Sequence, residues 1–260
     1  MRPSHEAFAA DHFAGQTVLI TGAAGGMGLE TARAFAAHGA RVMLTDLDGA
    51  AAERGAAAIR AAGGSAVSRA LDVGDPASIE ATFAAVDQEL GTLDHAVTCA
   101  AILTSTRIPA TTWAHWHKVL DINLLGTFFV VQGALARMLP RKQGSIVCVA
   151  SDAGFRGGGG LIADAAYAAS KAGVLSLVKS VAREIAGSGV RINALSPGPS
   201  DTAMHKTITP ELKARIADGL PMKRMGRPDD MAAAILFLSS SAAGFVYGAS
   251  LDVDGGSMFR

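Results

Sequence analysis

The sequence predicts an α/β protein whose doubly wound, mainly parallel seven-stranded sheet carries helices on both faces. Short apolar runs rich in β-branched residues alternate with segments of helical spacing along the whole chain, which is typical of repeated β-α units. A glycine-rich stretch joins the first such run to the first helical segment. With 260 residues, half of them hydrophobic, the chain can bury one large core.

The elements follow in order from these patterns. The expected strands are Thr17–Thr21, Arg41–Thr45, Val67–Leu71, Leu93–Cys99, Ser145–Ala150, Val190–Leu195 and Ser250–Val253. The expected helices are Met27–Ala37, Ala50–Ala61, Pro76–Leu90, Asn123–Met138 and Ala165–Ala186, and Asp75 before Pro76 is a suitable cap. We expect residues 1–15 to form a flexible N-terminal extension and residues 16–260 to form a single domain.

Composition excludes several classes. The formal net charge is zero and no basic stripe occurs, so we expect no nucleic-acid partner. No secretory pattern and no uninterrupted apolar run of roughly 18 residues occurs, which predicts a cytoplasmic protein with no membrane partner. Cys99 and Cys148 lie in apolar runs and are expected to be buried free thiols. His115 and His117 are two apart and point away from each other on a helix, so no metal site is predicted.

The stretch Thr21–Gly28 (TGAAGGMG) has the context of a dinucleotide site. A strand that enters a helix through glycines lets the helix N-terminal amides approach a pyrophosphate. The candidate residues are Gly22, Gly25, Gly26, Met27 and Gly28. A tight turn that merely needs small residues is the alternative interpretation.

Asp46 ends the second strand, eighteen residues after Gly28. A carboxylate there can accept hydrogen bonds from ribose hydroxyls and repels a 2′-phosphate, and no lysine or arginine lies between Gly22 and Gly28 to offset the repulsion. The expected cofactor is therefore NAD(H). Alternatively Asp46 only caps the following helix, a role that Asp48 could also fill.

Tyr167 and Lys171 are four residues apart, and therefore on one face of a helix. A lysine ammonium beside a phenol favours the phenolate and lowers a pKa that starts near ~10, as general acid–base catalysis requires. Ser151 lies sixteen residues upstream. A surface tyrosine and lysine on a solvated face is the alternative.

Together these motifs resemble the short-chain dehydrogenase/reductase family. The similarity runs from Gln16 to Gly256 and includes the glycine turn, Asp46, Ser151, the Tyr167-Lys171 pair and Asn193–Pro199. The resemblance implies a Rossmann-type sheet and NAD(P)-dependent oxidation of alcohols or reduction of carbonyls.

The resemblance also implies roles for particular residues. Tyr167 would be the general acid–base, Lys171 would lower its pKa and hold the nicotinamide ribose, Ser151 would bond the substrate oxygen, and Asn123 would hold a water in the proton relay. Further cofactor contacts would come from residues that follow the ends of the strands, namely Leu47, Asp72, Val73, Cys99, Ala100, Ala101, Pro197, Gly198, Ser200 and Thr202.

The chain departs from the family pattern in two places. Thr98–Ala101 (TCAA) stands where the family often has Asn-Asn-Ala-Gly, which would keep backbone contacts to the cofactor and lose asparagine hydrogen bonds. The Ser151–Tyr167 spacing is about three residues longer than usual, with Gly157–Gly160 inside it. Residues Gly157–Asp164 are therefore expected to form a mobile loop over the substrate. If that loop displaces Ser151, the serine assignment fails.

The resulting prediction is an enzyme that interconverts a largely uncharged secondary alcohol and a ketone. Alternatives are a 3-oxoacyl thioester reductase of the same family and a non-catalytic NAD-binding scaffold. Arg107 and Arg156 could bind an acidic group but are expected to be solvated. The run Leu124–Val131 is apolar on nearly every side, so a partner subunit could cover one face of its helix, and we expect a homotetramer or homodimer.

Overall fold

The structure is a computed structural model, and it describes residues 8–158, 163–201 and 208–259. Within these residues, seven parallel strands form one sheet in the order β3-β2-β1-β4-β5-β6-β7. The strands are β1 (Thr17–Thr21), β2 (Arg41–Asp46), β3 (Ser65–Ala70), β4 (His95–Thr98), β5 (Gly144–Val149), β6 (Val190–Pro197) and β7 (Ser250–Val253). The predicted fold class is confirmed.

The direction of winding reverses between β1 and β4. These strands are neighbours, with Val18 beside His95 and Thr21 beside Thr98, but the chain places β2 and β3 on one side and β5 to β7 on the other. Loops that leave the carboxyl ends of β1 and β4 therefore diverge and open a crevice between them, which is where open α/β sheets bind ligands.

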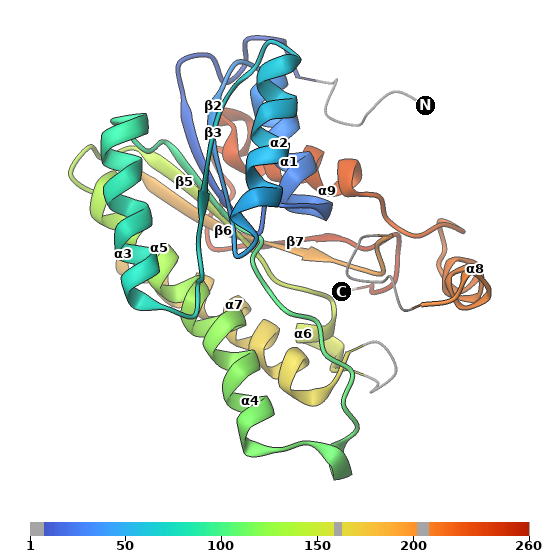
Figure 1. The fold of residues 1–260 in the computed structure, drawn as a ribbon. Helices are drawn as coiled ribbons and strands as arrows, with labels where there is room; N and C mark the ends of the chain where they lie inside the picture. The colour runs from blue at the N-terminus through green and yellow to red at the C-terminus, as the bar shows by residue number, and fades with distance from the viewer. Residues whose placement is uncertain (1–7, 159–162, 202–207, 260) are drawn as a thin grey trace.

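Helices cover both faces of the sheet (Figure 1). The helices are α1 (Gly26–Ala37), α2 (Gly49–Ala61), α3 (Pro76–Ala85), α4 (Trp113–Leu120), α5 (Gly126–Met138), α6 (Ala153–Arg156), α7 (Ala165–Glu184), α8 (Pro210–Gly219) and α9 (Pro228–Ser239). Side chains alternate between faces along a strand, so Val18 and Ile20 pack with α1, α2 and α9, whereas Leu19 packs with α3, α5 and α7. Two hydrophobic cores result, one on each side of the sheet.

The helix boundaries differ from the sequence prediction in several places. The segment expected as one helix from Pro76 ends in a π-helical turn, Val86–Leu90. The helix expected from Asn123 begins earlier, at Trp113, and passes through a π-helical turn, Asp121–Leu125, before it continues as α5. The sequence prediction omitted α8 and α9, although Thr209 caps α8 and Pro210 occupies its first turn, a typical start signal.

The continuous helix Trp113–Met138 is the one helix in the described ranges that is long and apolar enough to cross a membrane, judged by length and composition. Its inner side is a core surface: Val130, Val131 and Ala134 are buried against the sheet. A core helix of a soluble protein satisfies the same criterion.

The segment before β1 packs on the domain where the structure describes it. Phe13 is fully buried, with its ring 4.7 Å from that of Phe35 and 5.5 Å from that of His95. Part of the expected N-terminal extension, from residue 8 onward, thus contributes to the core.

Candidate active site

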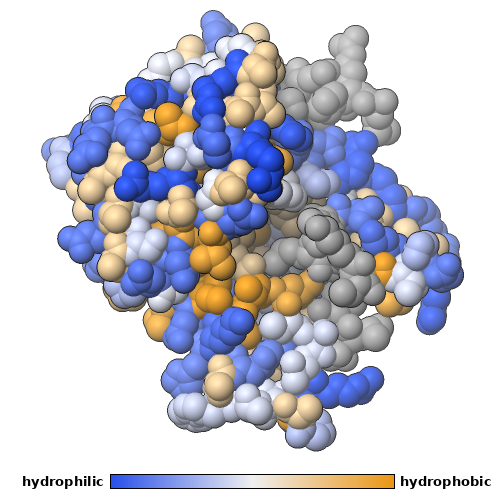
Figure 2. Space-filling view, viewed as in Figure 1, coloured by the Kyte–Doolittle hydropathy of each residue, from blue (hydrophilic) through white to orange (hydrophobic). Residues whose placement is uncertain are grey.

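A cavity of about 610 Å³ lies at the carboxyl edge of the sheet, over the crevice between β1 and β4. Figure 2 shows hydrophobic surface near the middle of this side of the molecule, above α4 and α7. Eighteen of the predicted site residues line the cavity: Gly22, Gly25, Gly26, Met27, Gly28, Asp46, Leu47, Asp72, Val73, Cys99, Ala100, Ala101, Ser151, Tyr167, Lys171, Pro197, Gly198 and Ser200.

The glycine turn is built for close backbone approach. Gly22 has φ +67°, and a Cβ there would lie 2.7 Å from the Ala100 nitrogen. A Cβ on Gly28 would collide with the Gly22 carbonyl oxygen, so the turn and the first residues of α1 pack directly on each other. Gly25, which precedes α1 and gives no side-chain cap, faces open space. The first amides of α1 are therefore accessible to a pyrophosphate.

Asp46 ends β2 at the rim of the cavity. Its Oδ2 accepts a hydrogen bond from the Ala24 amide (3.0 Å) and its Oδ1 accepts one from the Asp48 amide (3.1 Å). The helix-cap alternative for Asp46 is wrong, because Asp48 caps α2 by accepting from the Ala51 amide at 2.9 Å. The Asp46 carboxylate instead anchors the glycine turn and lies beside it.

The sequence TCAA at Thr98–Ala101, which departs from the family pattern, still allows hydrogen bonds between the end of β1 and the loop that follows β4. The Cys99 amide donates to the Thr21 carbonyl and the Ala100 amide donates to Thr21 Oγ1, both at 3.2 Å. Burial raises the pKa of both Cys99 and Cys148 to about 12, and both are free thiols, as predicted.

Tyr167 and Lys171 lie in the first turns of α7 and share the cavity with Ser151, which follows β5. Lys171 is buried, and its Nζ donates to the Val149 carbonyl (2.8 Å) and lies 5.8 Å from the centre of the Tyr167 ring. Burial lowers the pKa of Lys171 to about 8.

The expected lowering of the Tyr167 pKa by Lys171 is wrong for this chain. Burial raises the pKa of Tyr167 to about 12; the Ser151 hydroxyl acts to lower it and the Asp152 charge acts to raise it. The reason is desolvation of the phenolate, which spacing along a helix does not reveal.

Ser151 keeps its place at the cavity despite the longer loop. It is buried, accepts from the Ala153 amide and donates to Asp152 Oδ1, both at 3.2 Å. Asp152 also pairs with Arg156 at 2.9 Å, and both residues line the cavity, but the Arg156 side chain is 55% exposed, as expected of a solvated arginine. Of the loop Gly157–Asp164 that the sequence predicts to be mobile, residues 159–162 lie outside the described residues, so its mobility stays a prediction.

Asn123 lies behind the cavity wall rather than in it. Its Oδ1 accepts from the Ile102 amide (2.8 Å), and its Nδ2 donates to the Ile102 carbonyl (3.0 Å) and to Ser170 Oγ (3.1 Å). Asn123 lies in the π-helical turn Asp121–Leu125, and its side chain thus connects this turn to Ser170 of α7 and to Ile102 after β4. Its role in a water relay stays a prediction, and Thr202 lies outside the described residues.

Part of the cavity lining is apolar, and the residues that form it were not singled out from the sequence, apart from Met225. This part includes Ile102, Leu103, Ala163, Ile208 and Ile216, from three separate parts of the chain. Only the start signal of α8 could have pointed to Ile216. Among the described residues, no group of three or more histidine, cysteine or acidic side chains could hold a metal ion.

The parallel sheet, the glycine turn at its switch point and the tyrosine–lysine–serine group define a nicotinamide-dependent oxidoreductase. A family model described as "Enoyl-(Acyl carrier protein) reductase" matches residues 22–258. The chain belongs to the short-chain dehydrogenase/reductase family.

Similar proteins cover nearly the whole chain. The chain is 37% identical over 247 residues to 2-(S)-hydroxypropyl-CoM dehydrogenase 3 of Xanthobacter autotrophicus (93% of this chain, 96% of the relative). It is 34% identical over 246 residues to a 3-oxoacyl-acyl-carrier-protein reductase of Escherichia coli (94% and 98%). A crystal structure of a short-chain type dehydrogenase/reductase from Mycobacterium marinum superposes with a TM-score of 0.90 at 29% identity (96% and 98% covered).

Proposed function

We propose that this protein is an NAD(H)-dependent enzyme that interconverts a secondary alcohol and a ketone, with Tyr167 as the general acid–base. The observation that carries the proposal is the meeting of Tyr167, Lys171 and Ser151 in the cavity that the glycine turn also lines. When bound, NAD would accept a hydride from the carbinol carbon, and the chain itself would manage one proton.

The protein groups divide that work. Tyr167 exchanges a proton with the substrate oxygen, and Ser151 Oγ, after turning from Asp152, donates a hydrogen bond to the same oxygen. Lys171 holds the ribose next to the nicotinamide. Because burial keeps the pKa of Tyr167 near 12, the protonated phenol that reduction of a ketone requires is abundant at neutral pH, whereas oxidation draws on the scarcer phenolate.

Asp46 supports NAD(H) over NADP(H). The carboxylate is held at the cavity rim by two backbone amides, and a 2′-phosphate bound there would face its negative charge. The apolar lining from Leu103, Ile208 and Ile216 supports a small to medium, largely uncharged substrate.

Reduction of a 3-oxoacyl thioester is the second candidate, favoured by the similarity to the E. coli reductase. A non-catalytic NAD-binding scaffold is the third. Comparison of a simple ketone with a 3-oxoacyl thioester as substrates separates the first two. Substitution of Tyr167 separates both enzymes from the scaffold.

We also propose a cytoplasmic homotetramer or homodimer. Leu125, Phe128 and Phe129 are 36–47% exposed on the outer side of the helix Trp113–Met138, whose inner side is buried in the core. A second subunit that covers these side chains would remove them from water.

The first experiment is a fluorescence titration with NADH and, separately, NADPH, because it needs no substrate. Tight binding of NADH alone is expected, followed by turnover in a screen of secondary alcohols with NAD. Tyr167→Phe should then lose nearly all turnover and keep NADH binding. Failure to bind either nucleotide would contradict the proposal, and unchanged turnover in Tyr167→Phe would refute the mechanism.

A further inference from the structure

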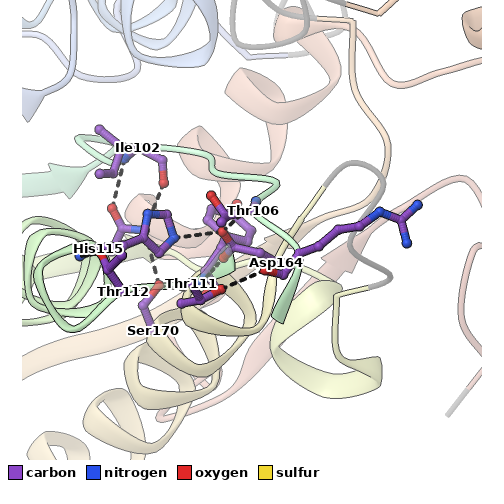
Figure 3. A network of polar contacts seen from close by, with 10 residues as sticks. Ile102, Thr106, Thr111, Thr112, His115, Asp164 and Ser170 are labelled. Atoms are coloured by element: carbon purple, nitrogen blue, oxygen red, sulfur yellow. Dashed lines mark hydrogen bonds and ion pairs between the residues drawn. The ribbon is translucent and has the colours of Figure 1, made fainter. Parts of the chain in front are cut away.

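The catalytic helix α7 begins at a buried carboxylate, Asp164, three residues before Tyr167. Its side chain is 2% exposed. Oδ1 caps the helix by accepting a hydrogen bond from the Tyr167 amide at 2.9 Å. Oδ2 faces a different part of the chain, where it accepts from the Thr106 amide at 3.1 Å and lies 2.8 Å from Nε2 of His115 on α4 (Figure 3). One carboxylate thus joins three separate segments.

The segment that Asp164 holds continues directly from a wall of the cavity, because Ile102 and Leu103 line the cavity and the next residues, Thr104 and Thr106, bond to Asp164. Residues 102–106 have no regular secondary structure, so side chains and isolated backbone bonds determine their path. At one end Asn123 bonds both the amide and the carbonyl of Ile102. At the other end the Asp164 amide donates to the Thr104 carbonyl (2.8 Å) while its side chain accepts from Thr106. The residue between these anchors, Leu103, belongs to the apolar lining of the cavity.

The Asp164 carboxyl is suited to hold these donors in its ionised form. Burial acts to raise its pKa, but hydrogen bonds from Tyr167, Thr104, His115 and Thr106 outweigh burial and bring the pKa below its ordinary value. An ionised carboxylate offers two acceptor oxygens, and hydrogen bonds to a charged acceptor are stronger than those to a neutral one.

We propose that Asp164, assisted by His115, is a positioning residue for the reaction: it latches the substrate-facing wall, residues 102–106, to the first turn of the helix that carries Tyr167. The inference rests on the proposed function, because it assigns the wall to the alcohol and Tyr167 to the proton. The latch fixes the distance between the surface that binds the substrate and the phenol that acts on it, and a loose wall would weaken substrate binding without disturbing the nucleotide end.

Asp164→Asn separates the two roles of the residue. An asparagine keeps an oxygen for the Tyr167 amide and is an equally good helix cap, but it replaces Oδ2 by an amide group that cannot accept from Thr106. His115→Ala removes one donor and leaves the cap untouched, and His115→Gln restores an N–H of similar reach. Asp75→Asn, at the cap of α3, is a matched control for the same chemical change away from the cavity.

Each variant is compared with the wild type in three measurements: KM and kcat for an alcohol that the wild type oxidises, the Kd for NADH, and amide hydrogen exchange over residues 102–106. In Asp164→Asn we expect KM to rise about tenfold, the loss equivalent to one hydrogen bond to a charged group, with faster exchange in 102–106 and an unchanged Kd. His115→Ala should raise KM about threefold and His115→Gln should restore it. Asp75→Asn should match the wild type.

Unchanged KM and unchanged exchange in Asp164→Asn would overturn the latch. A rise in KM accompanied by weaker NADH binding would also overturn the latch, because that combination indicates a general structural role. If Asp164→Asn does not fold, an unchanged KM in His115→Ala overturns the latch instead. If the wild type turns over no alcohol, the proposed function has failed. The latch is then tested by amide exchange alone, and it is overturned if residues 102–106 exchange equally fast in Asp164→Asn and in the wild type.

Discussion

Asp46→Asn should relax the discrimination between NADH and NADPH. The substitution removes one negative charge at the cavity rim but keeps an oxygen that can accept from the Ala24 amide, so the glycine turn stays anchored. A carboxylate and a phosphate dianion about 5 Å apart repel by about 2 kcal/mol at the dielectric constant of water, and by more where water is partly excluded. Since 1.4 kcal/mol is a factor of about ten, the ratio of the two dissociation constants should change by at least about tenfold.

Fluorescence titration of both nucleotides against wild type and Asp46→Asn measures that ratio. Because surface charges are screened over about 10 Å at 0.1 M salt, the difference between the proteins should shrink as salt rises. Asp48→Asn is the matched control, since Asp48 lies two residues away and serves as the cap of α2. The reasoning is refuted if Asp46→Asn leaves the ratio unchanged, or if Asp48→Asn changes it equally.

Three further predictions concern pH and packing. Because the pKa of Tyr167 is raised to about 12, initial rates should rise with pH for oxidation and fall at alkaline pH for ketone reduction, and equal profiles would contradict the assignment. Burial lowers the pKa of His95 from 6.5 to about 4, so between those pH values only the unfolded chain binds a proton at this residue. The free energy of unfolding should therefore fall by about 3 kcal/mol as pH decreases from 6.5 to 4. Urea unfolding of His95→Gln at several pH values should lack this part of the pH dependence. Gly28→Ala should lose about 1–3 kcal/mol of stability in urea and most NADH affinity, because its Cβ meets the backbone of Gly22, whereas the stability of Gly25→Ala should match the wild type.

Much of the site was predictable because its motifs are local. Each motif is recognised from residues that are close together in the sequence. These motifs are the glycine turn between a strand and a helix, the acid at the end of the next strand and the tyrosine four residues before a lysine. Parallel strands then bring their carboxyl ends to one edge, and Gly22, Asp46, Ser151 and Tyr167 meet there without further information.

What sequence reasoning missed depends on contacts between distant segments. The partnership of Asp164 with His115 and Thr106 spans 49 and 58 residues, and each residue by itself suggests only a cap or a surface side chain. Likewise, the spacing to Lys171 suggested a lowered Tyr167 pKa, whereas burial by the surrounding elements raises it.

The sequence by itself determined the seven strands, the glycine turn and the identity of the proton-handling side chains, because periodicity and local motifs encode these. The tertiary structure decided which of those side chains share a cavity, that Asn123 stands behind its wall and that Asp164 joins that wall to the catalytic helix. The physical reason is that burial, desolvation and hydrogen bonding between remote segments arise only when the chain is packed.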